Sequence, residues 1–395
     1  MEVAAEKQGA TPKRLRLVDL FLLFLRLGAT AFGGPAMIPY VGEFVVKRKK
    51  WMDQQTFKGG VVLAQSIPGA TLMQTVGYVG LQMRGLPGAL VSYIAFGLPA
   101  FLLMLVFSAV YAEYGSLPRV TSVFAGLQVI VVAIVANATY TFGRTSLKHY
   151  MHAVLAVASA LAFWVGVSPF YVVLGAALAG IVFLKGTPET EPTKIQKKLI
   201  SPVPVVILLA ILAIGLICLY FVRPNLLKLV LLMMKIDLFA FGGGFASLPL
   251  MLQEVVRVRG WMDAKTFMDG IALGQATPGP IVITAAFVGY LTHRLLGAIV
   301  ATIGIFAPSF MLVVLTAPFF NRLKGSAVFS KATQGVLASF VGLLLFVVIR
   351  FSLAVPWNLF RVLIVLGSLI ALFKKVDLLY IVLIGAALSL VLFQP

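Results

Sequence analysis

Phe32-Gly33-Gly34-Pro35-Ala36-Met37-Ile38-Pro39 occurs twice in this chain, the second time as Phe241-Gly242-Gly243-Gly244-Phe245-Ala246-Ser247-Leu248-Pro249. Each copy lies within a long apolar run and precedes a basic loop that ends in Trp-Met-Asp, at 51–53 and at 261–263. A duplicated apolar segment that glycine and proline interrupt is the best sequence indication of the binding site of a membrane transporter.

The two copies stay in register far beyond this stretch. The superimposed pairs are Trp51 with Trp261, Gln65 with Gln275, Pro68-Gly69 with Pro278-Gly279, Gly80 with Gly289 and Pro99 with Pro308. One extra residue in the second copy shifts the register by one between the Gly-rich stretch and the Pro-Gly pair. General hydrophobicity does not keep so many residues in one order, so the chain is an internal duplication. Residues at equivalent positions are called counterparts below.

The composition excludes a soluble protein. The chain has 395 residues, of which 61% are hydrophobic and 11% charged, and its mean hydropathy is +1.03. So few polar side chains cannot cover the surface of a soluble domain, so we predict a polytopic membrane protein. The net charge of +19 is assigned to loops that orient membrane spans, with the lipid bilayer and not nucleic acid as the partner.

Cysteine and histidine are too scarce for a metal centre. Cys218 is the only cysteine of the sequence, which excludes an intramolecular disulfide and a cysteine-based metal cluster. The chain has only three histidines, so a histidine-rich site is not expected either. We predict no cofactor and no metal.

A spanning helix needs about 20 apolar residues, and the chain offers about thirteen such segments. They are 17–40, 54–83, 86–112, 119–142, 149–166, 168–184, 201–222, 225–250, 263–293, 295–320, 329–350, 357–373 and 376–394. This divides the chain into a cytoplasmic N-terminal segment (1–16), a first repeat (17–184), a linker with a connecting helix (185–222) and a second repeat (225–395). The predicted fold class is an all-α polytopic membrane protein.

Six spans and one connector make an odd number, so the second repeat enters the membrane from the opposite side. The prediction is therefore two inverted six-helix repeats with broken or half helices near the midplane. The distribution of lysine and arginine favours a cytoplasmic N-terminus and a C-terminus outside. The basic run 47–50 is an exception, and whether 17–46 and 54–83 span or re-enter the membrane stays open.

Arg26 and Lys235 are counterparts within apolar runs, each six residues before its Phe-Gly-Gly. A cation inside a span is expensive and faces a cavity or a partner, so we predict an anion-binding pair near the pseudo-twofold axis. Two alternatives stay open. The cations could pair with Asp19 and Asp237, although Asp237 follows Lys235 by two residues and points elsewhere on a helix. They could also extend toward the membrane interface.

Backbone amides near the breaks are the second set of predicted ligands. Glycine and proline leave amides without helical partners, and helix N-termini favour anions. The pairs Pro68-Gly69 and Pro278-Gly279 are predicted to start half-helices, with Ser66 and Thr277 as caps. The predicted substrate-binding residues are Arg26, Lys235, Gly33, Gly34, Gly242, Gly243, Gln65, Pro68, Gly69, Gln275, Pro278 and Gly279. Simple kinks, and hydrogen bonds between helices for the glutamines, are the structural alternatives.

Glu43 and Glu254 each precede a Trp-Met-Asp motif and are candidates for proton coupling, but their spacing to the motif differs by one residue. The basic loops 47–50 and 257–259 could concentrate an anion by their potential; topology signals and lipid contacts explain them equally well. Trp51 and Trp261 fit anchors at the membrane interface.

These duplicated motifs together resemble the chromate ion transporter family in its two-domain, long-chain form. The resemblance covers about 17–394 and is strongest in 26–99 and 235–308. It implies a multi-pass protein of the cytoplasmic membrane that exports chromate and confers chromate resistance, with sulfate as the isosteric competitor. The second copy departs from the first in having Gly244 in place of Pro35 and Lys235 in place of Arg26, which implies an approximately symmetric site.

A divalent oxyanion needs positive charge and many hydrogen-bond donors, which the predicted residues supply. We predict alternating access, in which the inside-negative potential favours anion exit by ~2.3 kcal/mol per charge per 100 mV. Uptake or exchange of sulfate or another small anion is the alternative. An enzyme is not predicted, because no catalytic residues are apparent: the sequence shows neither a nucleophile–base pair nor metal-cluster spacing at span depth. A homodimer stays open, because no segment argues for one.

Overall fold

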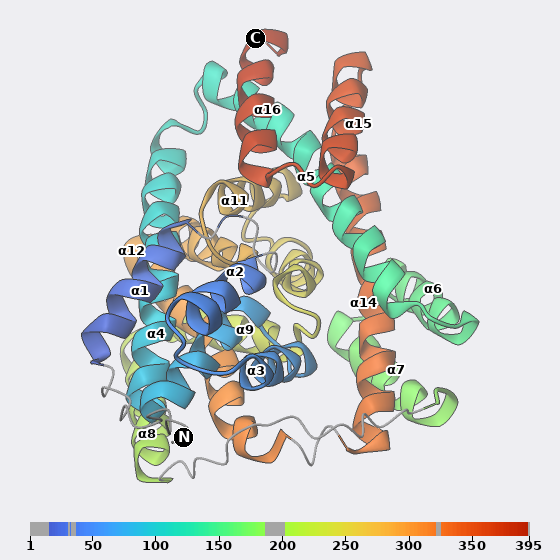
Figure 1. The fold of residues 1–395 in the computed structure, drawn as a ribbon. Helices are drawn as coiled ribbons and strands as arrows, with labels where there is room; N and C mark the ends of the chain where they lie inside the picture. The colour runs from blue at the N-terminus through green and yellow to red at the C-terminus, as the bar shows by residue number, and fades with distance from the viewer. Residues whose placement is uncertain (1–15, 31, 33–36, 186–201, 321–324, 394–395) are drawn as a thin grey trace, which may run out of the picture.

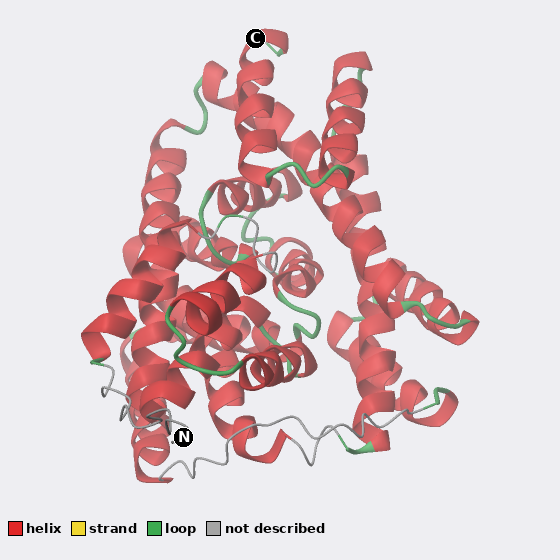
Figure 2. Cartoon of the chain, in the orientation of Figure 1, coloured by secondary structure: helices red, strands yellow, loops and turns green. Residues whose placement is uncertain are grey.

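The structure is a computed structural model that describes residues 16–30, 32, 37–185, 202–320 and 325–393. Within these ranges every regular element is a helix (Figures 1 and 2). This confirms the predicted all-α class.

The first repeat contains eight described helical elements. They are α1 (Leu17–Thr30), α2 (Ile38–Gly42), the π-helix η2 (Glu43–Arg48), α3 (Gln54–Ser66), α4 (Thr71–Tyr114), α5 (Pro118–Ser146), α6 (Tyr150–Trp164) and α7 (Pro169–Phe183). The connecting helix is α8 (Pro202–Val222).

The second repeat follows in the same order, with short 3₁₀ turns added. Its elements are α9 (Pro224–Phe239), η3 (Gly244–Ala246), α10 (Ser247–Met251), the π-helix η4 (Leu252–Val258), α11 (Ala264–Ala276), η5 (Ile281–Ile283), α12 (Thr284–Thr316), η6 (Ala317–Phe319), α14 (Ala327–Ala354), α15 (Leu359–Phe373) and α16 (Leu378–Leu392).

Glycine and proline break the segments that carry the motifs. The segment 54–83 is not one helix: α3 ends at Ser66 and α4 begins at Thr71, because Pro68 lacks an N–H and Gly69 has φ +115°. We call residues 67–70 the first break, and their equivalents 277–280 the second break. Similarly, α1 ends at Thr30, well before the end of the predicted segment 17–40.

α4 and α12 are helical hairpins. The backbone leaves helical geometry at Arg84 and Gly85 in α4, and at the counterparts His293 and Arg294 in α12. We call these positions elbows. Each hairpin therefore consists of a short first arm that leaves the break and a long second arm that returns across the protein.

Equivalent contacts recur between the two repeats. Gly126 on α5 packs against Ser389 on α16, and its counterpart Gly335 on α14 packs against Gly180 on α7, the counterpart of Ser389. Reciprocal contacts of this kind are what an isologous, approximately twofold interface produces.

The two hairpins run antiparallel at this interface. The Tyr93 hydroxyl of α4 donates to the Phe306 carbonyl oxygen of α12 at 3.1 Å, and the Tyr111 ring lies 5.1 Å from the Phe287 ring, centroid to centroid. Residue numbers therefore rise along α4 as they fall along α12. Antiparallel packing of equivalent helices is what an inverted repeat requires, and the orientation of the repeats in a bilayer stays a prediction.

Among the described residues, five helical segments are long and apolar enough to cross a membrane. They are Thr71–Tyr114, Pro118–Ser146, Val203–Val222, Ile281–Phe319 and Ala327–Ala354. Four further apolar helices, α6, α7, α15 and α16, are shorter. The full count of about thirteen spans therefore stays a prediction.

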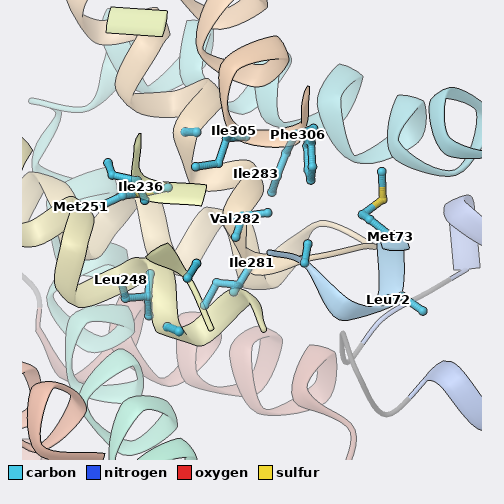
Figure 3. Close-up of a cluster of buried hydrophobic side chains, with 14 of the residues drawn as sticks. Leu72, Met73, Ile236, Leu248, Met251, Ile281, Val282, Ile283, Ile305 and Phe306 are labelled. Atoms are coloured by element: carbon cyan, nitrogen blue, oxygen red, sulfur yellow. The ribbon is translucent and has the colours of Figure 1, made fainter. Parts of the chain in front are cut away.

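The apolar core between the repeats surrounds the breaks. Figure 3 shows Leu72 and Met73 of the first arm of α4 near Ile281, Val282 and Ile283, which follow the second break. All five side chains are buried. The segments that follow the two breaks thus lie in the packed core of the described chain.

Candidate functional site

The two breaks meet at the interface between the repeats. Gly69 has φ +115° and Gly279 has φ +107°, which suits glycine alone. Gly69 packs against Ser309 on α12, and its counterpart Gly279 packs against Ala100 on α4, the counterpart of Ser309. Each break therefore touches the second arm of the opposite hairpin, and the structure brings the two Pro-Gly pairs to one region.

The Gly-rich segment of the second repeat lies between the breaks. Gly242 and Gly243 have φ +93° and +99°. Gly243 lies against Thr71, just after the first break, and Gly244 lies against Ile281, just after the second. Their predicted counterparts in the first repeat, Gly33 and Gly34, lie outside the described residues.

A buried carboxylate stands behind the first break. The backbone amide of Ala70 donates to Ser309 Oγ at 3.3 Å, and Ser309 donates from Oγ and from its backbone amide to Asp237, both at 2.7 Å. Asp237 is fully buried. The N-terminus of α4, which we predicted as an anion site, is thus already satisfied in part through Ser309.

The predicted caps Ser66 and Thr277 were wrong. Ser66 Oγ donates to the Val62 carbonyl oxygen at 2.7 Å, and Thr277 Oγ1 donates to the Gly274 carbonyl oxygen at 2.8 Å. Both side chains satisfy the last turn of the helix before the break, so neither reaches the amides after it.

A cavity of about 2180 Å³ leads to this region. Part of its lining lies beside the first break and the Gly-rich segment, and we call this part the inner end; it comprises Phe32, Gln65, Ser66, Thr71, Gly242, Gly244 and Phe245. The lining also includes a titratable group of residues, which we call the outer part: Arg144, Lys148, Lys185, Lys375, His149, His152 and Asp377. Four cationic side chains against one carboxylate make this a predominantly basic entrance. Of the predicted ligands, Gln65 and Gly242 line the cavity, whereas Arg26, Lys235 and Gln275 do not.

The wall of the cavity contains a histidine pair that sequence reasoning missed. His152 Nδ1 accepts from the His149 backbone amide at 3.3 Å, and His152 Nε2 lies 3.2 Å from Gln334 Oε1. Because Nδ1 accepts, Nε2 carries the proton that Gln334 accepts. This contact joins α6 to α14 across the repeats.

On the equivalent side of the second repeat, a buried carboxylate joins α11 to α4 and α5. Asp269 on α11 accepts from Gln128 Nε2 on α5 and from the Tyr111 hydroxyl on α4, both at 2.8 Å. We call these three residues the latch. In the first repeat α3 carries Gly59 where α11 has Asp269, and Leu337, the counterpart of Gln128, lines the cavity. The cavity therefore lies beside α3, and none of the described residues that line it belongs to α11.

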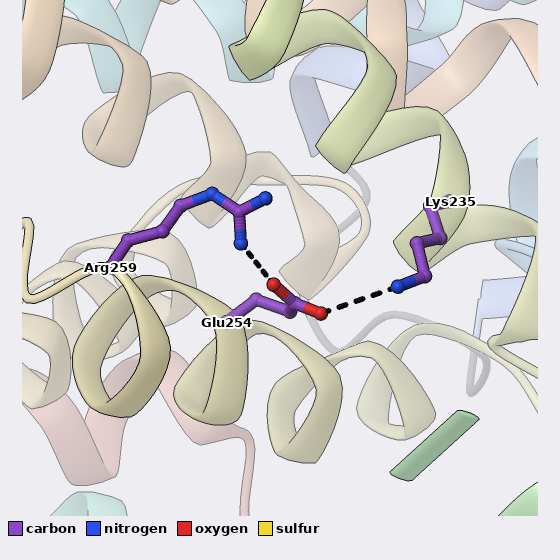
Figure 4. A network of polar contacts seen from close by, with 3 residues as sticks. All are labelled: Lys235, Glu254 and Arg259. Atoms are coloured by element: carbon purple, nitrogen blue, oxygen red, sulfur yellow. Dashed lines mark hydrogen bonds and ion pairs between the residues drawn. The ribbon is translucent and has the colours of Figure 1, made fainter. Parts of the chain in front are cut away.

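Lys235 and Arg26 differ in their surroundings. Lys235 Nζ lies 3.4 Å from Glu254 Oε1 and 3.6 Å from the centre of the Phe170 ring, and Figure 4 shows Arg259 bound to the same Glu254. Lys235 thus pairs with an acid, although with Glu254 and not with Asp237. Arg26 is exposed on α1 and forms no ion pair with a residue that the structure describes.

The two coupling candidates occupy π-helices. Glu43 Oε1 lies 2.9 Å from Arg48 Nη2 in η2, and Glu254 binds Arg259 at the same spacing beside η4. A π-turn places residues five apart over one another. The Glu254 side chain is 9% exposed and that of Glu43 is 43% exposed, so only the second repeat has its glutamate enclosed.

Comparison with known proteins agrees with this geometry. The profile of the chromate transporter family matches residues 18–181 and 227–390, once for each repeat. The chain belongs to the chromate transporter family. No solved structure matches it.

Named relatives extend over nearly the whole chain. An uncharacterized transporter of Methanocaldococcus jannaschii is 44% identical over 94% of this chain and 93% of its own length. A chromate transport protein of Cupriavidus metallidurans is 31% identical over 82% of this chain and 80% of its own length. A probable chromate transport protein of Synechococcus elongatus is 29% identical over 82% of each chain.

Proposed function

We propose that this protein exports chromate and similar tetrahedral oxyanions across the cytoplasmic membrane by alternating access, and thereby confers chromate resistance. The observation that carries the proposal is the basic cavity that ends at the Gly-rich segment between two broken helices. Cations at the entrance concentrate a dianion, and neutral donors at the inner end bind it without holding it too tightly to leave. The names of the relatives in Cupriavidus and Synechococcus support chromate as the substrate.

The cavity wall supports the direction. Arg144, Lys148, Lys185 and Lys375 all fall in segments that the positive-inside distribution assigns to the cytoplasm. The cavity would then open inward and load its anion from the cytoplasm. Exit of a dianion is favoured by ~2.3 kcal/mol per charge per 100 mV of inside-negative potential.

We assign direct anion contacts to Gln65, Thr71 and the backbone of Gly242–Gly244, which border the inner end of the cavity. The breaks at Pro68-Gly69 and Pro278-Gly279 hold that backbone in place. Gln275, Arg26 and Lys235 would contact the anion in the state that opens on the opposite side of the membrane. To reach that state, α11 and the π-helices must move. Sulfate, with the same tetrahedral geometry and charge as chromate, would compete.

Uptake of labelled chromate into inside-out vesicles, with and without sulfate, tests the function. We expect Gln65→Leu to lower uptake roughly tenfold, because a hydrogen bond to a charged group contributes ~1.5–3 kcal/mol. The matched control is Gln55→Leu on the exposed face of the same helix, which should leave uptake unchanged. Wild-type vesicles that take up neither anion under an imposed potential would refute the proposal.

A further inference from the structure

The seam between α3 and the first arm of α4 contains buried polar atoms that have no partner in the protein. Seven buried side-chain polar atoms in the described residues lack one, and three of these are Gln74 Oε1, Tyr78 OH and Gln82 Oε1. These residues are four apart, so they form a column along one face of the helix. Gln74 and Tyr78 are 0% exposed and Gln82 is 9% exposed.

The column begins beside the buried carboxylate. Gln74 Nε2 donates to the Pro68 carbonyl oxygen at 2.6 Å. Gln74 Nε2 and Ser309 Oγ are both near neighbours of Gly69, and Ser309 donates to Asp237. A polar series therefore runs from Asp237 through Ser309 and the first break to Gln74.

The column continues toward the elbow of α4. The Tyr78 ring packs on Gly60 of α3, and its hydroxyl lies near the Gln82 side chain without a direct hydrogen bond. Gln82 is two residues from Arg84 at the elbow. None of Gln74, Tyr78, Gln82 and Asp237 lines the large cavity, so this series is a separate route.

The spacing suits water. Four residues of helix rise about 6 Å, and two hydrogen bonds of about 2.8 Å through one water span nearly that distance. Buried polar atoms without protein partners are the places where ordered water belongs. A water between each pair of side chains would satisfy the column from the first break to the elbow.

The second repeat has no such series. The counterparts of Gln74, Tyr78 and Gln82 are Ile283, Phe287 and Leu291. The counterparts of Asp237 and Ser309 are Gly28 and Ala100. Phe287 packs on Gly270 as Tyr78 packs on Gly60, so the backbone seam is the same and only its chemistry differs. Packing alone therefore does not require the polar residues, which indicates a function for them.

We propose that Gln74, Tyr78 and Gln82 hold a file of water that carries protons between the α4 elbow and Asp237, and so couples oxyanion transport to protons. This inference rests on the proposed anion transport. A proton that enters the file is relayed from water to water. The Ser309 hydroxyl gives its hydrogen to the Asp237 carboxylate, which becomes a neutral acid, and takes one from the last water of the file; the reverse transfers return the proton. Tyr78 both donates and accepts, whereas each glutamine Oε1 accepts and positions a water.

The charge state of Asp237 controls the anion through Ser309. Ser309 on α12 donates to Asp237 and Tyr93 on α4 lies near it, whereas the Ala70 amide of the first break reaches it only through Ser309. On its own helix, Lys235 is engaged with Glu254. Within the described chain no ion pair involves Asp237, so its negative charge is uncompensated beside the anion site. Protonation of Asp237 and binding of a dianion therefore favour each other, and one proton accompanies each dianion.

Purified protein in liposomes that enclose a pH-sensitive dye tests the coupling, with chromate supplied above neutral pH, where it is dianionic. Wild type should acidify the lumen as chromate enters, and chromate affinity should fall as pH rises. Asp237→Asn should take up chromate with no proton and with an affinity that pH no longer changes.

Tyr78→Phe, which installs the side chain of its counterpart, should slow proton entry several-fold. Tyr290→Phe, on the first arm of α12, is the matched control.

Two further outcomes separate failure of the proposed water file from failure of the proposed transport function. Chromate entry into wild-type liposomes with no accompanying proton would overturn the water file and leave the proposed function intact, whereas absence of any chromate entry would overturn the proposed function itself. Infrared difference spectra give a readout that does not need transport: the carbonyl band of a protonated acid should appear on chromate binding in wild type and be missing in Asp237→Asn. A band that survives in that variant would remove Asp237 from the route.

Discussion

The half-helices α3 and α11 are counterparts in sequence and position, yet a buried carboxylate on α11 binds neighbouring helices and α3 has no such residue at the equivalent position. α11 is held to α4 and α5 through Asp269, whereas α3 lines the cavity with Val61, Val62 and Gln65. The backbone arrangement is shared, so the difference comes from side chains in which the repeats differ. Residues common to both repeats determine the shared backbone arrangement, and residues that differ between the repeats account for the different surroundings of α3 and α11.

The interfaces that α3 and α11 form with the first arms of α4 and α12 also share their backbone packing and differ in their side chains. Tyr78 and Phe287 pack on equivalent glycines, but only the first seam carries a polar column. A transporter with two identical halves would have equal energies with either side open. Here the latch holds α11 to α4 and α5, and the cavity lies beside α3; under the proposed alternating access, the latch would favour this state over the opposite one.

The largest expected effect separates the two breaks. Gly69→Ala would place its Cβ 1.8 Å from Ser309 Oγ at φ +115°, whereas Gly279→Ala would place its Cβ 3.1 Å from the Ala100 Cβ at φ +107°. Both substitutions impose backbone strain of about 1–3 kcal/mol. Only Gly69→Ala also displaces Ser309 from Asp237, so we expect it to lower the unfolding temperature more and to abolish anion uptake.

Thermal unfolding in detergent and vesicle uptake measure this contrast. Ser309→Ala with Gly69→Ala is the informative double variant, because removal of the hydroxyl relieves the 1.8 Å contact, while the 2.8 Å contact with the Cβ of residue 309 and the strain at φ +115° remain. Partial recovery of the unfolding temperature is expected. Equal losses for the two single variants would show that the breaks are energetically equivalent despite their different neighbours.

The helix breaks that the two repeats share were easier to predict from the sequence than the side-chain contacts in which the repeats differ. The breaks could be located because proline and glycine act locally on the backbone, and the counterpart pairs are visible without a structure. Asp269 and His152 were missed, because residues that are identical in the two repeats drew attention and these two positions differ between the repeats. The partners of Asp269 are 141 and 158 residues away in sequence, and only folding brings them together. The spacing of Gln74, Tyr78 and Gln82 was readable, but their burial was not.

The second prediction concerns the removal of the Asp269 charge from the latch. A hydrogen bond to a charged group contributes ~1.5–3 kcal/mol, so Asp269→Asn should shift the protein at least roughly tenfold toward a state with α11 released. Ala272 is 2% exposed, and its counterpart Val62 lines the cavity. In a Cys218→Ser background, thiol labelling of Ala272→Cys should rise with Asp269→Asn, and labelling of Val62→Cys should fall.

Asp377→Asn is the control for this experiment, because it removes a carboxylate at the cavity wall without touching α11. It should leave both labelling rates as they are. Labelling at Ala272→Cys that ignores Asp269→Asn would show that apolar packing, and not the latch, keeps the second side closed.

The smallest expected effect concerns the N-caps of the same two helices. Asp53 accepts from the Thr56 amide at 2.9 Å and from its hydroxyl at 2.7 Å, and Asp263 accepts from the Thr266 amide at 2.8 Å. Loss of such a cap costs about 1 kcal/mol. Because α11 is also held by the latch, Asp53→Ala should lower the unfolding temperature slightly more than Asp263→Ala does.

The pH dependence of this effect has a definite sign. The hydrogen bond from the Thr56 backbone holds the pKa of Asp53 below its usual value, so the charged cap stabilises the folded protein above about pH 4, the pKa of an unperturbed aspartate. That stability is lost as pH falls through the lowered pKa. The difference in unfolding temperature between wild type and Asp53→Ala should therefore shrink in acid, while Asp53→Asn, which caps without titrating, should keep its advantage over Asp53→Ala at every pH. A gap that is constant with pH would mean that the Asp53 charge contributes nothing and that the protonated side chain caps α3 equally well.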